Sequence, residues 1–242
     1  MRLPLTSLAI ILAATLPLRA QSQAPLIDLV AQNGTVTDQS QGSRTVQASP
    51  GLQAGVEPDS VISKNGNYLS VPINDKDTLF KSASSTWMVR VKFATDPGAT
   101  INPGMVYLPL GRWNPVNNLR AIGIAVVTTN RSLAFQVSTD GSVGQQSCSI
   151  AGKQAYPPVG KWVTLVGTYS PGTKMTIGAY TDDGAQAFSG TQLNNIAASY
   201  FEVNTALAVN APAEVGMAFS RARIWDRVLD DEEIQKAITG QK

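Results

Sequence analysis

Apolar and polar residues alternate with a period of two along most of the chain, from Leu26 to Leu229. The alternating segments are rich in Val, Thr, Ile and aromatic residues, and turn signals interrupt them about every eight to twelve residues. We expect strands in LIDLVA, NYLSVPI, WMVRVKFAT, MVYLPL, AIGIAVVTT, SLAFQVS, KWVTLVGTYS, TKMTIGAYT, FEVNTALAV and VGMAFSRARIW. The pattern therefore predicts an all-β protein.

Four dipeptides between these segments are typical of tight hairpins: Asn65-Gly66, Asp140-Gly141, Pro171-Gly172 and Asp183-Gly184. They supply the positive or fixed φ angles that such turns need. A stack of about ten antiparallel strands does not remain one open twisted sheet, so it closes into a barrel or packs as two sheets. We expect a two-sheet antiparallel sandwich, followed by one short C-terminal helix.

The expected helix begins within ARIWDRVLDDEEI, which carries four consecutive acids at positions 230–233. With Asp230 as the N-cap, Glu233 is placed to complete a capping box. Leu229 and Ile234 are placed to pack on each other as a hydrophobic staple. The two acids between cap and box partner lie where the helix dipole favours negative charge. The spacing thus predicts a helix start rather than a catalytic pair or a metal site.

The N-terminal segment has the layout of a secretory signal peptide. Its apolar run, Leu8–Leu16, is shorter than the roughly 20 residues that cross a bilayer. Small residues follow at Ala20 and Ala24, and cleavage after either one fits the pattern. We expect a leader over residues 1–24 and a single domain over residues 25–242, either secreted or, in a bacterium, periplasmic.

Charge and composition exclude several classes of function. Loss of Arg2 and Arg19 with the leader would leave 17 of the 19 basic residues against 17 acidic ones, so the mature protein would be formally neutral. Nucleic-acid binding needs a clustered basic excess, and no second apolar run suits membrane insertion. The chain contains no histidine, which excludes Ser-His-Asp and Cys-His catalysis and His-ligated zinc. The single cysteine, Cys148, is expected to be buried in a strand, and a reactive or intermolecular thiol is the alternative.

The order of five motifs resembles that of laminin-G-like domains of the concanavalin A-like lectin/glucanase superfamily. These motifs are NGTVTDQS (33–40), NGNYLSVP (65–72), STWMVRVKF (85–93), GKWVTLVGTYSPGTKMTIGAYTDDG (160–184) and the closing ARIWDRVLDDEEI (222–234). The chain departs from the family in lacking a His after the Trp of its fourth motif and an Asn-Gly tip in that hairpin. The resemblance implies a jelly roll of two curved sheets. Members bind glycans, proteins or apolar ligands, some degrade polysaccharides, and many hold calcium.

Catalysis by the family's usual machinery is not expected. Glycanases of this superfamily carry Glu-x-Asp-x-x-Glu on one strand, so that two carboxylates lie at the separation that glycoside hydrolysis requires. The glutamates of this chain are Glu57, Glu202, Glu214, Glu232 and Glu233, and none begins such a motif. An unfamiliar pair, such as Glu202 with Asp182, remains as an alternative.

The tryptophans provide the candidate ligand site. Trp87, Trp162 and Trp225 lie in alternating segments and are expected in the core. Trp113 lies in GRWNPVNNLR, a predicted loop in which amide and guanidinium donors flank the ring. An aromatic face beside such donors suits sugar recognition, and a Trp folded back over a sheet edge is the alternative. The predicted ligand-binding residues are Arg112, Trp113, Asn114 and Asn118.

Two aspartates are candidates for a structural calcium ion. Asp38 could bind the ion together with backbone carbonyls, and Asp226 could contribute a second carboxylate. An Asx turn of Asp38 with Ser40 is the alternative.

These observations predict an exported, non-catalytic carbohydrate-binding module that recognises a glycan or another cell-surface or matrix ligand. Two alternatives come from other classes: a glycoside hydrolase or lyase with non-standard carboxylates, and a protein-binding adhesion or matrix module.

Overall fold

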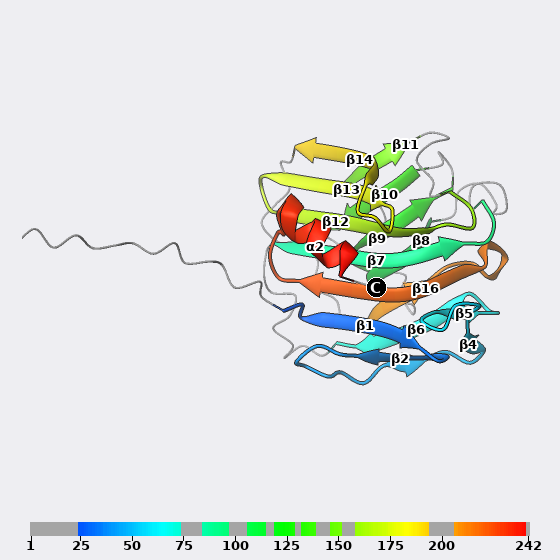
Figure 1. Ribbon diagram of the computed structural model, residues 1–242. Helices are drawn as coiled ribbons and strands as arrows, with labels where there is room; N and C mark the ends of the chain where they lie inside the picture. The colour runs from blue at the N-terminus through cyan, green and yellow to red at the C-terminus, as the bar shows by residue number, and fades with distance from the viewer. Residues whose placement is uncertain are drawn as a thin grey trace, which may run out of the picture.

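The computed structural model describes residues 24–73, 84–96, 106–114, 119–128, 132–138, 146–151, 158–193 and 206–240. Two antiparallel sheets face each other, and helix α2 (Asp231–Thr239) lies on the outer face of one of them (Figure 1). The predicted two-sheet sandwich with one short C-terminal helix is confirmed. Among the residues described, no helix is long and apolar enough to cross a bilayer.

The larger sheet has nine strands and carries the helix. In spatial order its main path is β14 (Gln186–Leu193), β13 (Lys174–Tyr180), β12 (Trp162–Ser170), β7 (Ser85–Phe93), β16 (Met217–Trp225), β1 (Ile27–Gln32) and β2 (Thr35–Asp38). β5 (Val61–Ser63) pairs with β16 beside β1, and β4 (Leu52–Ala54) pairs with β5. The last strand thus lies between β7 and β1, next to the first one.

The smaller sheet has seven strands and forms the second layer. Its order is β11 (Gln146–Ala151), β10 (Ser132–Val137), β9 (Leu119–Val127), β8 (Val106–Asn114), β15 (Ala206–Asn210), β6 (Asn67–Pro72) and β3 (Gln47–Ala48). The chain passes repeatedly from one sheet to the other, as in a jelly roll. The Tyr68 hydroxyl of β6 donates to the Met217 carbonyl of β16 and so links the two layers.

All ten predicted segments overlap strands. The sequence pattern missed the short β2, β3, β4 and β5, and also β14, whose sequence QAFSGTQL lacks a clear alternation. β11 was expected only as the strand that contains Cys148. Strands of two to four residues present too few positions for a period to be recognised.

The glycine turns have the conformations that the sequence predicted. Gly66, Gly172 and Gly184 have φ angles of 78°, 65° and 83°, respectively. The predicted turn at Asp140-Gly141 lies outside the described residues. Asn33-Gly34, which begins the NGTVTDQS motif but is not one of the four predicted hairpin dipeptides, joins β1 to β2 with positive φ at both residues, as a two-residue hairpin requires.

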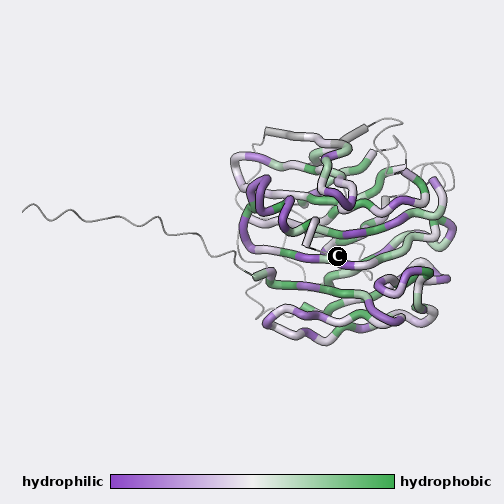
Figure 2. The backbone as a smooth tube through the Cα atoms, viewed as in Figure 1, coloured by the Kyte–Doolittle hydropathy of each residue, from purple (hydrophilic) through white to green (hydrophobic). Residues whose placement is uncertain are grey.

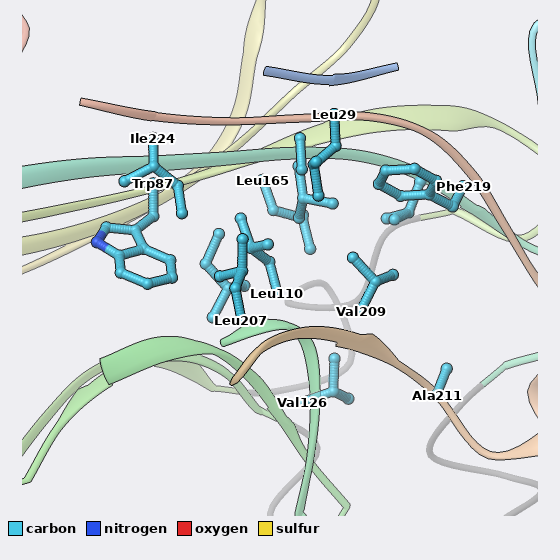
Figure 3. Close-up of a cluster of buried hydrophobic side chains, with 14 of the residues drawn as sticks. Leu29, Trp87, Leu110, Val126, Leu165, Leu207, Val209, Ala211, Phe219 and Ile224 are labelled. Atoms are coloured by element: carbon cyan, nitrogen blue, oxygen red, sulfur yellow. The ribbon is translucent and has the colours of Figure 1, made fainter. Parts of the chain in front are cut away.

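The main core lies between the sheets. Figure 2 shows apolar segments along many of the strands, and Figure 3 shows apolar side chains of the two layers meeting in the interior. Trp87 is fully buried there, and Cys148 is buried on β11, both as predicted. Gly167 of β12 leaves room for the Phe135 ring of the opposite sheet, because a Cβ at this position would overlap that ring.

A second, smaller core fixes the helix to the outer face of the larger sheet. Ile234 and Ile238 of α2 cluster with Met88, Val166 and Trp225 of that sheet. The burial of Trp225 agrees with its predicted place in a core, although this core lies outside the sandwich. The helix therefore divides the outer face of the sheet into separate surfaces.

Candidate functional site

The predicted ligand-binding residues lie at the end of β8 and in the segment that follows it. Arg112, Trp113 and Asn114 belong to the strand, so the predicted loop is wrong at these positions. β8 pairs with β9 on one side, and with β15 on the other as far as Trp113. This pairing satisfies backbone N–H and C=O groups, and it outweighs the turn preference of the local Asn and Pro residues. Asn118 lies outside the described residues.

Arg112 faces the interior of the sandwich. It stands opposite Ile122 of β9 and Leu207 of β15, and both of these residues belong to the main core. Directly opposed residues of paired strands share one face of a sheet. Only 7% of Arg112 is exposed. Its guanidinium is thus largely removed from solvent, unlike the surface donor that the sequence predicted.

The Asp38 carboxylate accepts hydrogen bonds from three backbone N–H groups. Oδ1 accepts from the N–H groups of Asp28 (3.1 Å) and Ser40 (3.0 Å), and Oδ2 accepts from the N–H of Arg44 (3.0 Å). Burial would raise the pKa of Asp38, but these hydrogen bonds outweigh it and lower the pKa below the ordinary value. The Asx turn with Ser40, the alternative at this position, is present.

The N–H groups bound to Asp38 reduce its capacity to bind the predicted calcium ion. The amides occupy lone pairs that a cation would need, and the Arg44 guanidinium lies 3.8 Å from Asp38 Oδ2. Asp226, the second predicted ligand, is half-buried directly after β16. Within the described ranges, no group of three or more Cys, Asp or Glu residues is arranged to hold a metal ion. The donor set at Asp38 therefore does not suit calcium.

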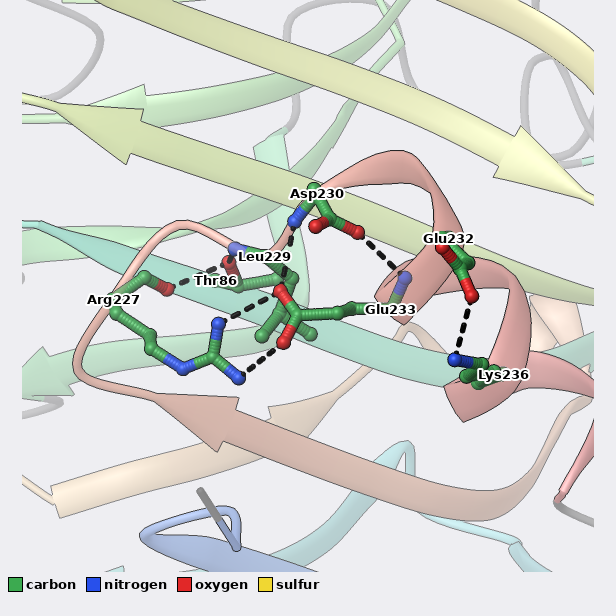
Figure 4. A network of polar contacts seen from close by, with 7 residues as sticks. All are labelled: Thr86, Arg227, Leu229, Asp230, Glu232, Glu233 and Lys236. Atoms are coloured by element: carbon green, nitrogen blue, oxygen red, sulfur yellow. Dashed lines mark hydrogen bonds and ion pairs between the residues drawn. The ribbon is translucent and has the colours of Figure 1, made fainter. Parts of the chain in front are cut away.

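The four consecutive acids form the predicted helix start (Figure 4). The Glu233 N–H donates to Asp230 Oδ1 (2.8 Å), and the Asp230 N–H donates to Glu233 Oε2 (3.1 Å), so both halves of the capping box are present. Leu229 and Ile234 are buried in one cluster, as the staple requires. The network also contains an element that the sequence analysis missed: Arg227 binds Glu233 through two hydrogen bonds of 2.7 Å.

Three pockets surround α2 on the outer face of the larger sheet, and the helix contributes residues to each of them. One, of about 440 Å³, lies between the helix N-terminus and β12, β13 and β14. A second, of about 210 Å³, lies beside Trp162 and contains Ile238 of the helix. The third, of about 430 Å³, lies between α2 and the described N-terminus and contains Trp225.

The first pocket, which we call the hydroxyl groove, has one polar and one apolar wall. Its polar wall contains Thr168, Ser170, Thr176, Tyr180, Gln186 and Ser189. Its apolar wall contains Val228, Leu229 and Ile234 at the start of α2, and Val166 adds an aliphatic side chain on the same face of β12 as Thr168 and Ser170. The groove thus sets hydroxyl and amide groups against aliphatic side chains, at a size that falls within the range of small-ligand sites.

Hydrogen bonds order the polar wall but do not exhaust its capacity. The hydroxyl oxygens of Thr168 and Thr176 are 2.5 Å apart, and the Gln186 amide donates to the Tyr180 hydroxyl (3.1 Å). Burial raises the pKa of Tyr180, so its phenol stays protonated at neutral pH and retains a proton to donate. A ligand with hydroxyl groups would therefore meet both donors and acceptors here.

Trp162 does not lie in the core, contrary to the sequence-based expectation. It begins β12 on the outer face of the sheet and is half-buried. The Arg90 guanidinium lies 4.3 Å from the centre of its ring, and Lys92 Nζ lies 5.1 Å from it. Arg90 forms a bidentate pair with Asp182 (3.0 and 2.7 Å), and Lys92 pairs with Glu57. The ring thus supports two cations, each of which holds a carboxylate.

Only one member of the alternative catalytic pair, Asp182, lies in the part of the chain that the structure describes. Asp182 forms the bidentate pair with Arg90 described above. Its proposed partner, Glu202, lies outside the described residues.

Comparison with known proteins identifies the fold. No protein-family model and no curated protein sequence matches the chain. Among solved structures, the receptor binding domain of botulinum neurotoxin C/D mosaic serotype matches with a TM-score of 0.66 and 14% identity, over 90% of this chain and 51% of that one. The chain shares the fold of the matched part of these toxin binding domains. It spans about half the length of each matched chain.

Two further neighbours extend this result. The binding domain of Paraclostridial Mosquitocidal Protein 1 matches with a TM-score of 0.65 and 14% identity, over 90% of this chain and 52% of that one. The ligand binding domain of botulinum neurotoxin serotype D, solved in complex with N-acetylneuraminic acid, matches with a TM-score of 0.58 and 12% identity, over 90% and 51%. Likeness at such low identity concerns the fold alone, and the function has to be argued from the site.

Proposed function

We propose that the chain is an exported, non-catalytic carbohydrate-binding module of laminin-G-like architecture, and that a saccharide occupies the hydroxyl groove. The observation that carries this proposal is the pairing of a hydroxyl and amide wall on β12, β13 and β14 with an apolar wall at the start of α2. A pyranose has the complementary surface, with hydroxyl groups at its rim and C–H groups on its faces.

The polar wall supplies several groups that can act together. Thr176 and Gln186 lie on adjacent strands and are only partly buried or exposed, so a ligand can reach them. The Gln186 amide offers an acceptor oxygen and a second N–H besides the one bound to Tyr180. Groups on rigid paired strands lose little entropy when they bind, and this favours recognition of a polyol.

The apolar wall supplies the second requirement. Val228 is 40% exposed in the turn between β16 and α2, beside the buried Leu229 and Ile234. An exposed aliphatic side chain next to ordered hydroxyl groups can cover a C–H face of a sugar and remove it from water.

The composition of the groove favours binding over glycan cleavage. Asp231 is the one carboxylate among the residues that line it, and it lies in the first turn of the helix. Retaining and inverting glycosidases both use two carboxyl groups that flank the scissile bond. A complex of one structural neighbour with N-acetylneuraminic acid makes sialylated glycans an early choice for testing.

The experiment is a glycan array, followed by calorimetric titration of the best soluble saccharide. Thr176→Val and Gln186→Ala each remove a polar group from the groove and should weaken binding about three- to tenfold, since a net hydrogen bond contributes about 0.5–1.5 kcal/mol. Thr37→Val makes the same change as Thr176→Val on exposed β2 and should bind like the wild type. If no saccharide binds, or if both groove variants bind with unchanged affinity, the proposal is overturned.

A further inference from the structure

We propose that the pocket beside Trp162 is a second binding site, which takes the protonated amine of an amino sugar. This inference rests on the proposed function only in taking a saccharide as the ligand. It concerns other residues than those of the hydroxyl groove. The pocket is lined by Glu57, Asp59, Arg90, Trp162, Asp182 and Ser220, together with Pro58 and Ile238.

Carboxylates form the outward side of the pocket. In the pair of Arg90 with Asp182, 17% of the cationic side chain is exposed against 46% of the carboxylate side chain. In the pair of Lys92 with Glu57, the values are 21% and 42%. In both pairs the cation is held against Trp162 beneath its partner. In each pair the carboxylate is therefore more accessible to a ligand than the cation is.

One carboxylate at the pocket is not neutralised. Asp59 is exposed, and it forms no ion pair with any residue that the structure describes. Three carboxylates thus face two cations at this place, which leaves a formal charge of minus one. A single ammonium group would balance that charge. The hydrogen bond from Lys92 lowers the pKa of Glu57, so this carboxylate stays ionised at neutral pH.

Ser220 offers a ligand a hydrogen-bonding group that is independent of the acidic side chains. Ser220 is 92% buried, since only 8% of it is exposed, and yet it lines the pocket. Its hydroxyl makes no hydrogen bond to any other described residue. Ser220 lies at the point where β16 shifts register against β7, between Phe219 and Arg221. Such a bulge re-aims a side chain and is frequent next to functional sites.

The volume and the lining residues of the pocket indicate which class of ligand it can bind. A volume of about 210 Å³ suits one small group rather than an oligosaccharide chain. The half-buried Trp162 supplies an apolar surface for the carbon skeleton, Ser220 supplies a hydrogen bond, and the carboxylates supply the charge. Metal binding is a poorer fit, because no acidic cluster in the described part of the chain has a metal-ligating arrangement.

The test compares two saccharides with the same sugar backbone: a fully deacetylated glucosamine tetramer, whose amines carry positive charge, and its neutral N-acetylated form. Calorimetry is performed on the full chain at a pH at which the amines are protonated. The deacetylated tetramer should bind more tightly, and its affinity should fall as salt is added because a charge interaction is screened. Equal affinity for the two tetramers would overturn the proposal.

Two conservative variants test whether the amine binds in the pocket beside Trp162. Asp59→Asn removes the unpaired charge at constant shape and should weaken binding of the deacetylated tetramer about fivefold, in the upper range for an exposed charge pair. Ser220→Ala should weaken it about threefold through loss of one hydrogen bond. Glu214→Gln removes a charge from an exposed residue that lines none of the three pockets, and it should have no effect. Wild-type affinity in both pocket variants would show that the amine binds elsewhere and would overturn the proposal.

The two proposals can fail separately. Thr176→Val and Gln186→Ala should leave the preference for the deacetylated tetramer unchanged, because they lie outside the Trp162 pocket. If only these groove variants abolish the preference, the amine binds in the groove and the inference about Trp162 is wrong. If no neutral saccharide binds but the preference persists and depends on Asp59, the pocket stands and the groove proposal fails.

Discussion

Arg227 and Glu233 form a bidentate ion pair across the turn that leads from β16 into α2, with both N–O distances at 2.7 Å. Glu233 also accepts from the Asp230 N–H, so one carboxylate closes the turn and caps the helix (Figure 4). Thr86 of the neighbouring β7 accepts from the Leu229 N–H and donates to the Arg227 carbonyl. The helix that borders all three pockets is therefore fixed to the sheet by a continuous polar network.

Removal of this carboxylate should loosen the helix. We expect Glu233→Ala to lower the free energy of unfolding by about 1–2 kcal/mol, because it removes the box partner and leaves Arg227 without its acceptor. This corresponds to a Tm about 3–6 °C lower for a domain of this size. The measurement is thermal unfolding followed by circular dichroism.

A neighbouring glutamate provides the control. Glu232 pairs with Lys236 one turn along the helix, and both side chains are more than 70% exposed. Glu232→Ala should change the free energy of unfolding by less than about 0.5 kcal/mol. Equal Tm values for the two variants would show that the Arg227 network does not hold the helix.

The same pair predicts a pH dependence. The hydrogen bond from Arg227 lowers the pKa of Glu233 below its ordinary value. Because the pKa is lower in the folded than in the unfolded state, the pair stabilises the fold fully above the unfolded value of about 4.3. The stabilisation is lost as the pH falls through the lower folded value.

Urea unfolding of wild type and Glu233→Gln from pH 6 to pH 3 tests this expectation. The wild type should be the more stable of the two at pH 6, and the difference should shrink below about pH 4, where the wild-type carboxylate also becomes neutral. A difference that stays constant over this range would show that Glu233 does not titrate at a lowered pKa.

The sequence predicts those features of the structure that depend on residues close together in the chain. The capping box is set by residues three positions apart, and the strands by a period of two, so both could be predicted. Trp162 could not be placed, because which face of its strand is covered depends on strands and a helix distant in the sequence. The hydroxyl groove combines β12, β13 and β14 with α2. Outward Thr and Ser positions in β12 were its local signal.

Substitution of Asp38 tests whether this residue binds calcium, as the sequence predicts, or only accepts the observed hydrogen bonds. Asp38→Asn keeps the shape but replaces one of the acceptor oxygens on which the backbone N–H groups of Asp28, Ser40 and Arg44 converge. We expect a loss of about 1–3 kcal/mol of stability, because a buried donor is left unsatisfied. The loss should be the same in chelator and in millimolar calcium. If the wild-type Tm rises with calcium and the Asp38→Asn Tm does not, the ion is bound there.

The last prediction separates the two candidate saccharide sites, the hydroxyl groove and the end of β8. Trp113 is paired with Arg120 and Ala206 in the smaller sheet, whereas the groove lies on the outer face of the larger sheet. With a saccharide selected on the array, Trp113→Ala should retain wild-type affinity, and Gln186→Ala should lose about three- to tenfold. Tm values measured on both variants separate loss of binding from loss of fold.

The reverse result would have an equally definite meaning. If Trp113→Ala abolished binding at an unchanged Tm while Gln186→Ala did not affect it, the ligand would lie at the end of β8, as the sequence predicted. The buried Arg112 then provides a further check. Since its guanidinium is on the interior face, Arg112→Lys should lower stability more than affinity if the groove is the site. It should lower affinity at nearly constant Tm only if a ligand reaches that guanidinium.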